Sequence, residues 1–267
     1  DVEIAGGVIN AVNEINLFTQ DAVTQMALGA AGADWSLLDT ELAKIDITAK
    51  LTIGEQNIQY GSISFSTISL SGNIGILEVN SNNTTGSIIL DDEGISTALA
   101  GAGANLILNA GSGGISAVSA TNSYAELESG FAAITLNTTF QADGNIGSET
   151  NRVQFAGSQE EVSLFTNSGD IWIGGLSDVT GVTYNIIDTY SGVPAVDSGS
   201  LSIVNNGGTT PINLLGNIDT SNTGPGAGGI QRFGAAGIAN PLTLLTNVNL
   251  LSARSEEHTS ELQSPNT

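Results

Sequence analysis

Short runs of alternating apolar and polar residues, separated by turns, predict that this chain is built from many brief β-strands. A triplet of glycine, a small polar residue and isoleucine opens many of these runs, at 61–63, 72–74, 86–88, 144–146, 169–171 and 216–218. Glycine and Asn or Asp tolerate the positive φ that a tight corner needs, and a β-branched isoleucine then begins a strand that packs inward. We therefore expect β-coils stacked on one another, with these triplets at their corners.

The alternation changes phase within two of the apolar runs. These faults separate Ile63 and Phe65 from Ile68 and Leu70, and Ile74 and Ile76 from Leu77 and Val79. A single flat strand cannot bury both sets, because successive side chains point to opposite faces. We expect a corner between two short strands at each fault. Further short strands are expected at 106–108, 134–136, 153–155, 162–164, 171–173, 201–203 and 212–214.

The turns show no strict period. Those that start at 72, 86, 144, 169 and 216 are separated by unequal intervals. Coils of roughly 20–25 residues with loops of variable length would explain this spacing, as in other solenoids. One continuous parallel stack of about ten coils follows from that repeat length. Ile63, Ile74, Ile88, Leu106, Leu108, Ile134, Leu136, Leu164, Ile173 and Ile203 should share its interior.

Two segments near the amino terminus raise the question of a helix. Residues 8–31 have loosely helical apolar spacing, but their asparagines and glycines favour turns, so we expect two or three short strands there. Residues 37–43 are the better helix candidate. Ser36 can cap it, and Asp39 would lie near the positive end of its dipole. If Ser36 is the cap, Ser36→Ala should weaken the start of the helix by about 1 kcal/mol.

Composition favours an aliphatic, acidic, exported protein. Of 267 residues, 40% are hydrophobic but only 5% are aromatic, so small aliphatic side chains must build the core. The absence of cysteine rules out disulfides and thiolate metal sites. A net charge of −22 repels a phosphate backbone, so we expect no nucleic-acid partner. No run approaches the roughly 20 apolar residues that span a bilayer, so we expect no direct membrane insertion.

The two ends of the sequence suggest a fragment of a larger protein, followed by a C-terminal segment of unrelated origin. The chain opens at Asp1 without a basic-then-apolar leader. Residues 254–264 resemble the translation of a common sequencing adapter. This segment contains the one histidine of the chain and also three glutamates, although residues 224–251 before it contain no acidic residue. We expect 1–253 to form a single β-helix segment. Residues 254–267 should be an artefactual or disordered tail that packs against nothing.

Three stretches resemble a known class of repeats. Residues 35–54, 106–115 and 144–152 are similar to repeat units of filamentous-haemagglutinin-like giant bacterial surface proteins, and the similarity extends over roughly 34–218. The resemblance implies an all-β, right-handed parallel β-helix that is exported by a two-partner or autotransporter-type route. It also implies an adhesin at the bacterial cell surface or outside the cell. An adhesive rod would display loops to a receptor or glycan on a host or cell surface.

The alternative function is a secreted carbohydrate-active enzyme or sugar-binding module on the same scaffold. A polysaccharide lyase needs clustered bases, whereas Lys44, Lys50, Arg152 and Arg232 are scattered in sequence. A hydrolase needs paired carboxylates in a cleft. A groove lined by acids and Trp172 would favour this alternative, and smooth faces of Ser, Thr and Asn would favour the rod.

Individual chemical motifs are weak. Asp91, Asp92 and Glu93 could bind calcium or a sugar, but such a cluster is more often a solvated turn. Asp170 and Asp178 flank Trp172 and could form a sugar site, although Trp172 could equally lie outward on a coil or cap the core. The glycine-rich stretches 101–104 and 111–114 lack the spacing of a nucleotide loop, so we expect turns. We assign no catalytic, cofactor-binding or metal residue, expect no cofactor and do not expect an enzyme.

Overall fold

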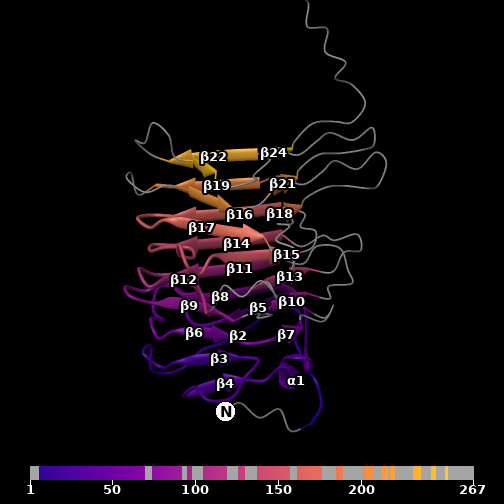
Figure 1. Ribbon diagram of the computed structural model, residues 1–267. Coiled ribbons are helices and arrows are strands. Elements are labelled where there is room, and N and C mark those ends of the chain that lie inside the picture. The colour runs from indigo at the N-terminus through magenta and orange to yellow at the C-terminus, as the bar shows by residue number, and fades with distance from the viewer. Residues whose placement is uncertain are drawn as a thin grey trace, which may run out of the picture.

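The protein is all-β, with parallel sheets and almost no helix. The computed structural model describes residues 6–69, 74–91, 95–97, 105–118, 126–129, 137–156, 161–175, 185–188, 201–206, 212–215, 217–219, 231–235, 242–244 and 250–251. Every strand pairing among these residues is parallel. The strands stack along one direction (Figure 1). At one end lie β4 (Trp35–Leu37) and α1 (Asp39–Leu42), and at the other lie β22 (Gln231–Ala235) and β24 (Leu250–Leu251).

Four sheets contain these strands. The long sheet contains β1 (Ile9–Asn10), β2 (Glu14–Leu17), β5 (Ile45–Ile53), β8 (Ile74–Ser81), β11 (Asn105–Ala110), β14 (Asn137–Ala142), β16 (Glu161–Thr166), β19 (Leu201–Asn205) and β22 (Gln231–Ala235). The seven-stranded sheet contains β7 (Ile68–Ser69), β10 (Ile95–Thr97), β13 (Leu127–Ser129), β15 (Val153–Ala156), β17 (Ile171–Gly175), β20 (Ile212–Leu215) and β23 (Leu242–Leu244). The five-stranded sheet contains β3 (Met26–Leu28), β4 (Trp35–Leu37), β6 (Ile63–Phe65), β9 (Ser87–Leu90) and β12 (Gly114–Ala117). The three-stranded sheet contains β18 (Asn185–Asp188), β21 (Asn217–Asp219) and β24 (Leu250–Leu251).

From β5 to β13 the chain visits the three larger sheets in a fixed order. From β5 it passes to β6 in the five-stranded sheet, then to β7 in the seven-stranded sheet, and returns to the long sheet at β8. The same order is repeated by β8, β9 and β10, and again by β11, β12 and β13. We call one such pass a level. Each of these three levels therefore adds one strand to each of the three larger sheets, beside the strand of the level before. From β16 onward each level instead adds one strand to the long, the seven-stranded and the three-stranded sheet.

The isoleucines of the recurring triplets are buried, as the sequence predicted. Ile63, Ile88, Ile146 and Ile171 lie in a single column, whose register runs through Met26, Ile63, Ile88, Ile115, Ile146, Ile171, Ile212 and Leu242. The described members of the expected interior set are all buried, namely Ile63, Ile74, Ile88, Leu106, Leu108, Leu164, Ile173 and Ile203. Ile134 and Leu136 lie outside the described residues. Side chains from all four sheets form one hydrophobic cluster.

The glycines of these triplets are needed for a different reason from the one predicted. Gly61, Gly86, Gly144 and Gly169 do not have a positive φ. Instead, the backbone of a neighbouring segment leaves no room for a side chain. A Cβ at Gly86 would overlap the Ser81 carbonyl oxygen, and one at Gly144 would overlap the Ser112 carbonyl oxygen. These glycines therefore permit close approach of chain segments and do not serve the turn conformation.

One of the two phase faults is a corner, as expected, and the other is not. β6 belongs to the five-stranded sheet and β7 to the seven-stranded sheet, so the chain does change direction between Phe65 and Ile68. At the second fault β8 continues unbroken, and the prediction of a corner is wrong. Ile47 pairs with Ile74 and Lys50 with Ile76, so β5 has one extra residue there. This irregularity in register coincides with the change of phase.

The amino-terminal elements agree with the prediction except for the helix cap. Three short strands, β1 to β3, form within residues 8–31. Helix α1 (Asp39–Leu42) forms within the expected range, but Ser36 does not cap it, because Ser36 is an extended, buried residue of β4 that pairs with Ala27. Leu38 precedes the helix, and its N–H donates to Glu41 Oε2 at 2.8 Å. The predicted effect of Ser36→Ala on a cap therefore no longer applies.

Most levels of the long sheet are longer than predicted. Leu51 pairs with Leu77, Leu77 with Leu106, and Val162 with Leu201, so each pair marks the step from one level to the next. Each of these three steps exceeds the coil of roughly 20–25 residues that the spacing of turns suggested. Because β1 and β2 pair with different parts of β5, the nine strands of the long sheet make eight levels in the described residues, fewer than the expected ten.

Candidate functional site on the outer face of the long sheet

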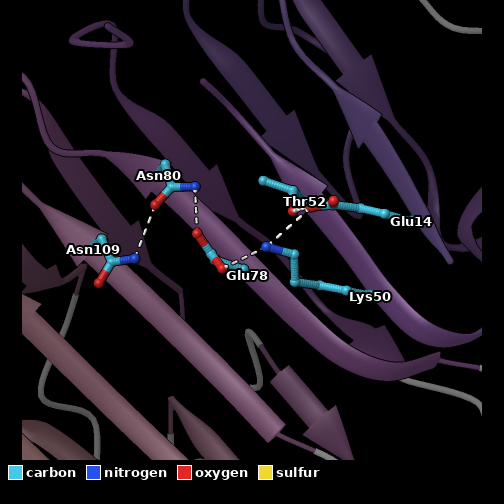
Figure 2. A network of polar contacts seen from close by, with 6 residues as sticks. All are labelled: Glu14, Lys50, Thr52, Glu78, Asn80 and Asn109. Atoms are coloured by element: carbon cyan, nitrogen blue, oxygen red, sulfur yellow. Dashed lines mark hydrogen bonds and ion pairs between the residues drawn. The ribbon is translucent and has the colours of Figure 1, made fainter. Parts of the chain in front are cut away.

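A row of polar side chains covers the outer face of the long sheet near its amino-terminal end. Strand alternation places them there, because Leu51, Ile53, Leu77, Val79 and Leu108 occupy the buried phase of the same strands. Figure 2 shows these side chains and the contacts between them. The members of the row are Glu14 from β2, Lys50 and Thr52 from β5, Glu78 and Asn80 from β8, and Asn109 from β11.

Lys50 joins two carboxylates from the strands on either side of it. Its Nζ lies 3.0 Å from Glu14 Oε1 and 3.1 Å from Glu78 Oε2. Thr52 adds a hydrogen bond from its Oγ1 to Glu14 Oε1 at 3.1 Å. All four side chains are part of one network that links three strands (Figure 2). The network holds a single positive charge between two negative ones.

Carboxamides continue this network along the stack. Asn80 donates from Nδ2 to Glu78 Oε1 at 2.9 Å, and Asn109 donates from Nδ2 to Asn80 Oδ1 at 2.8 Å. Asn80, Asn109 and Gln141 are register partners on the successive strands β8, β11 and β14. Asn80 is 0% exposed, whereas Gln141 is exposed. Along this row of amides, the side chain on β8 is therefore buried, and the side chain on β14 is accessible to solvent.

The ion pairs keep the central groups charged. A hydrogen bond from Lys50, followed by one from Thr52, lowers the pKa of the Glu14 carboxyl below its ordinary value. The hydrogen bond to Glu14 is likewise the largest cause that raises the pKa of Lys50. Glu14 therefore stays ionised to a lower pH, and Lys50 stays protonated to a higher pH, than the free side chains.

Two adjoining hollows lie over this row. The first has a volume of about 250 Å³ and is lined by Glu14, Lys50, Glu78 and Phe18, among others. The second has a volume of about 220 Å³ and is lined mostly by carboxamides, including Asn57, Asn82, Asn109 and Gln141, with Asp143 beside them. Gln56 lines both hollows. We call the two hollows together the polar groove.

The acidic cluster considered from sequence is only partly described. Asp91 is partly buried at the end of β9, while Asp92 and Glu93 lie outside the described residues. In the part of the chain that the structure describes, no three His, Cys, Asp or Glu side chains gather closely enough to hold a metal ion.

Trp172 faces outward, as one of the interpretations of the sequence expected, and it does not cap the core. Its neighbours Ile171 and Ile173 are buried, so Trp172 lies on the opposite face of β17. The Arg152 guanidinium carbon lies 6.0 Å from the centroid of the Trp172 ring, a cation–π distance. Asp170 donates its backbone N–H to Asn145 Oδ1 at 2.8 Å. Asp178 lies outside the described residues. Among the described residues, the structure thus brings Arg152 to Trp172.

Sequence reasoning missed the groove. Lys50 was counted among scattered bases, and Glu14 and Glu78 both lie far from it along the chain. Parallel pairing of β2, β5 and β8 brings the three together. The one signal available beforehand was that all three occupy the polar phase of apolar strands.

Comparison with known proteins supplies no assignment. The chain matches no family model, no curated protein and no solved structure. The resemblance to filamentous-haemagglutinin-like repeats therefore stays a prediction. Among the described residues, no helix has the length and apolar character needed to cross a bilayer.

The ion pair gives a titration that can be tested. We expect Lys50→Gln to raise the pKa of Glu14, because the strongest stabiliser of its charged form is removed. The direction in which stability changes with pH follows from the lowered pKa of Glu14. The stabilisation by Glu14 is present above its unfolded-state pKa and is lost as pH falls through the lower folded-state value. Carboxyl ¹³C NMR across a pH series measures the midpoint. Lys44→Gln is the matched control, and an unchanged Glu14 midpoint in Lys50→Gln would contradict the ion pair.

Proposed function

We propose that this chain is a right-handed parallel β-helix segment that serves as a structural, adhesive rod of an exported bacterial surface protein. The observation that carries the proposal is that the chain returns to the long sheet after each pass through the other sheets. A chain that returns to the same sheet after each pass, and always pairs in parallel with the level before, winds in one direction. Parallel strands joined by such crossovers are right-handed in about 98% of cases.

The packing supports a mechanical role. Buried columns such as Ile53, Val79, Leu108, Phe140, Leu164 and Ile203 run through successive levels of the long sheet. Each level contacts mainly its neighbours, as in other solenoids, so length can be extended without a larger core. The connections between levels vary, and the one from Val162 to Leu201 is much longer than the one from Thr138 to Val162. Long connections of this kind offer surface for attachment.

The electrostatics of the polar groove favour binding over catalysis. A general acid near neutral pH needs a raised carboxyl pKa, and a lysine base needs a lowered one. Glu14 and Lys50 are shifted in the opposite directions, because each stabilises the charge of the other. The groove therefore holds fixed charges and hydrogen-bonding groups, which suits a sugar-binding surface. A binding module within the rod is accordingly the second candidate function.

Adhesion without turnover is the expected result for the purified chain. Beads coated with the folded chain should adhere to cell layers more strongly than beads coated with the heat-unfolded chain, which has the same charge. The chain should release neither unsaturated nor reducing ends from pectin, alginate or host glycans. Equal adhesion of the folded and unfolded chains would contradict the adhesive role. Product release that disappears in Glu14→Gln, Glu78→Gln, Asp170→Ala or Asp92→Ala would show an enzyme instead.

A further inference from the structure

The polar groove contains hydrogen-bonding groups that the protein does not use internally. Gln56 and Gln141 line the second hollow, and neither side chain makes a hydrogen bond to the described part of the chain. Asn109 donates to Asn80 but keeps its own Oδ1 available within the same described part. Asn80, by contrast, is buried and bonded through both ends of its amide. The Asn80 amide is therefore fully used within the protein, whereas Asn109, Gln141 and Gln56 have groups that can hydrogen-bond to a ligand.

The spacing of the amides matches a repeating ligand. Asn109 and Gln141 are register partners on adjacent parallel strands. Neighbouring strands lie about 4.8 Å apart, which is close to the length of one pyranose unit. A sugar chain that runs along the stacking direction would present successive units to successive strands. Carboxamides suit this task, because each offers a donor and an acceptor to neighbouring hydroxyls.

An exposed aromatic ring lies at the other end of the groove. Phe18 is 54% exposed and lines the first hollow among otherwise polar groups. Leaving a large apolar ring in water is unfavourable unless it is covered. The C–H face of a pyranose ring is an apolar surface of matching size, and aromatic rings with a polar surround commonly serve this kind of contact.

The charge of the groove selects against anionic ligands. Three carboxylates, Glu14, Glu55 and Glu78, line the first hollow beside Lys50, whose ammonium is already paired with two of them. Asp143 adds a fourth carboxylate in the second hollow. Carboxylates accept hydrogen bonds from hydroxyls but repel uronates, sulfates and phosphates.

We propose that the polar groove binds an uncharged oligosaccharide aligned with the stacking direction. Gln56, Asn109 and Gln141 hydrogen-bond its hydroxyls, and Phe18 stacks on one ring. This inference rests on the proposed function, because it names the ligand class of the rod's outer face. Each hollow is smaller than the roughly 300–1,000 Å³ of a drug-sized pocket, so the groove contacts a few sugar units along one side.

Calorimetry with matched hexasaccharides tests the proposal on the full chain. The uncharged probes are cello-, malto-, xylo- and mannohexaose, and the anionic probe is hexagalacturonate. We expect at least one uncharged probe to bind with a Kd of about 1 mM or below, and hexagalacturonate to bind about tenfold more weakly or not at all. Gln141→Ala and Phe18→Ala should each weaken binding about tenfold, the loss expected for one hydrogen-bonding group or one stacking face.

Control variants keep the test specific. Gln25→Ala and Val118→Ala remove an exposed amide and an exposed apolar side chain outside both hollows, and they should leave binding unchanged. Absence of binding to all four uncharged probes overturns the proposal, as does equal binding of hexagalacturonate or binding that Gln141→Ala and Phe18→Ala do not change. Bead adhesion measured with the same variants separates the two claims. Adhesion that persists in Phe18→Ala and Gln141→Ala leaves the adhesive rod standing and removes the groove as its ligand site.

Discussion

Gly144→Ala is expected to lower the free energy of unfolding by about 3 kcal/mol, at the upper end of the cost of overpacking. A methyl group at this position would overlap the Ser112 carbonyl oxygen and lie 2.8 Å from its carbonyl carbon. Both atoms belong to backbone, so neither can rotate away as a flexible side chain would. The next segment along the stack is equally close, because a Cβ at Gly169 would overlap the Gly144 carbonyl carbon. A backbone shift that makes room for the new methyl group would therefore also strain the segment around Gly169. Because these backbone segments are in contact, one of them cannot move aside without moving its neighbour.

Urea unfolding followed by circular dichroism measures this effect. Gly6→Ala is the matched control, because a Cβ at Gly6 meets nothing within 4 Å and its φ is not positive. The control should change stability by a few tenths of a kcal/mol at most, as surface substitutions do. If Gly144→Ala and Gly6→Ala were equally stable, the close approach at this corner would be refuted.

Phe155→Ala should cost about 3–5 kcal/mol, the largest effect that we expect of any single substitution. The Phe155 ring is fully buried, and its centroid lies 5.8 Å from that of Phe140, which is also fully buried. Because the core is built mainly from smaller aliphatic side chains, its neighbours cannot fill the space of a lost ring. The same urea titration gives the free energy of unfolding.

Two further variants identify the cause of that loss. Phe18→Ala removes the same side chain from an exposed position and should leave stability nearly unchanged. The double variant Phe140→Ala/Phe155→Ala should be less destabilised than the sum of the single variants, by about 0.5–1.5 kcal/mol for the ring contact. Strict additivity would show that the two rings do not interact.

The sequence predicted the strands and the buried column because both depend on local pattern. Ile63, Ile88, Ile146 and Ile171 follow a glycine and a small polar residue, and all four occur where that pattern placed them. The long gap between the turns at 86 and 144 hid one more member. Ile115 completes the column there, but glycine replaces the polar residue before it, so this triplet departs from the recurring pattern. Gly72 and Gly216 belong to triplets whose isoleucines lie in other sheets, which obscured the period further.

The reason for each corner glycine could not be read from the chain. A positive φ and a close approach both require glycine, and only the position of the neighbouring level distinguishes them. Gly114 and Gly147 do have a positive φ, whereas Gly86 and Gly144 do not. The sequence shows a glycine in both cases and does not distinguish the two reasons.

The polar groove was beyond sequence reasoning for a related reason. Glu14, Lys50 and Glu78 meet only because β2, β5 and β8 pair with a particular register. The connections between these strands differ in length, so no fixed spacing marks the three residues as neighbours. The pKa shifts of Glu14 and Lys50 depend in turn on that contact. A local pattern therefore predicts which side of a strand is polar, but not which polar groups on different strands will touch.

The nearest-neighbour pairing of levels bears on how such a chain can change length during evolution. Leu77 and Leu106 are register partners, so joining Leu77 directly to Ile107 would fuse the first half of β8 to the second half of β11 with the inward phase intact. The fused strand would still present the partners that β14 needs on one side and β5 on the other. Unequal recombination between such positions removes or duplicates a complete structural unit and creates no new type of interface. A gene of this design can therefore lengthen or shorten its product in whole steps, while the parallel pairing between neighbouring levels is kept.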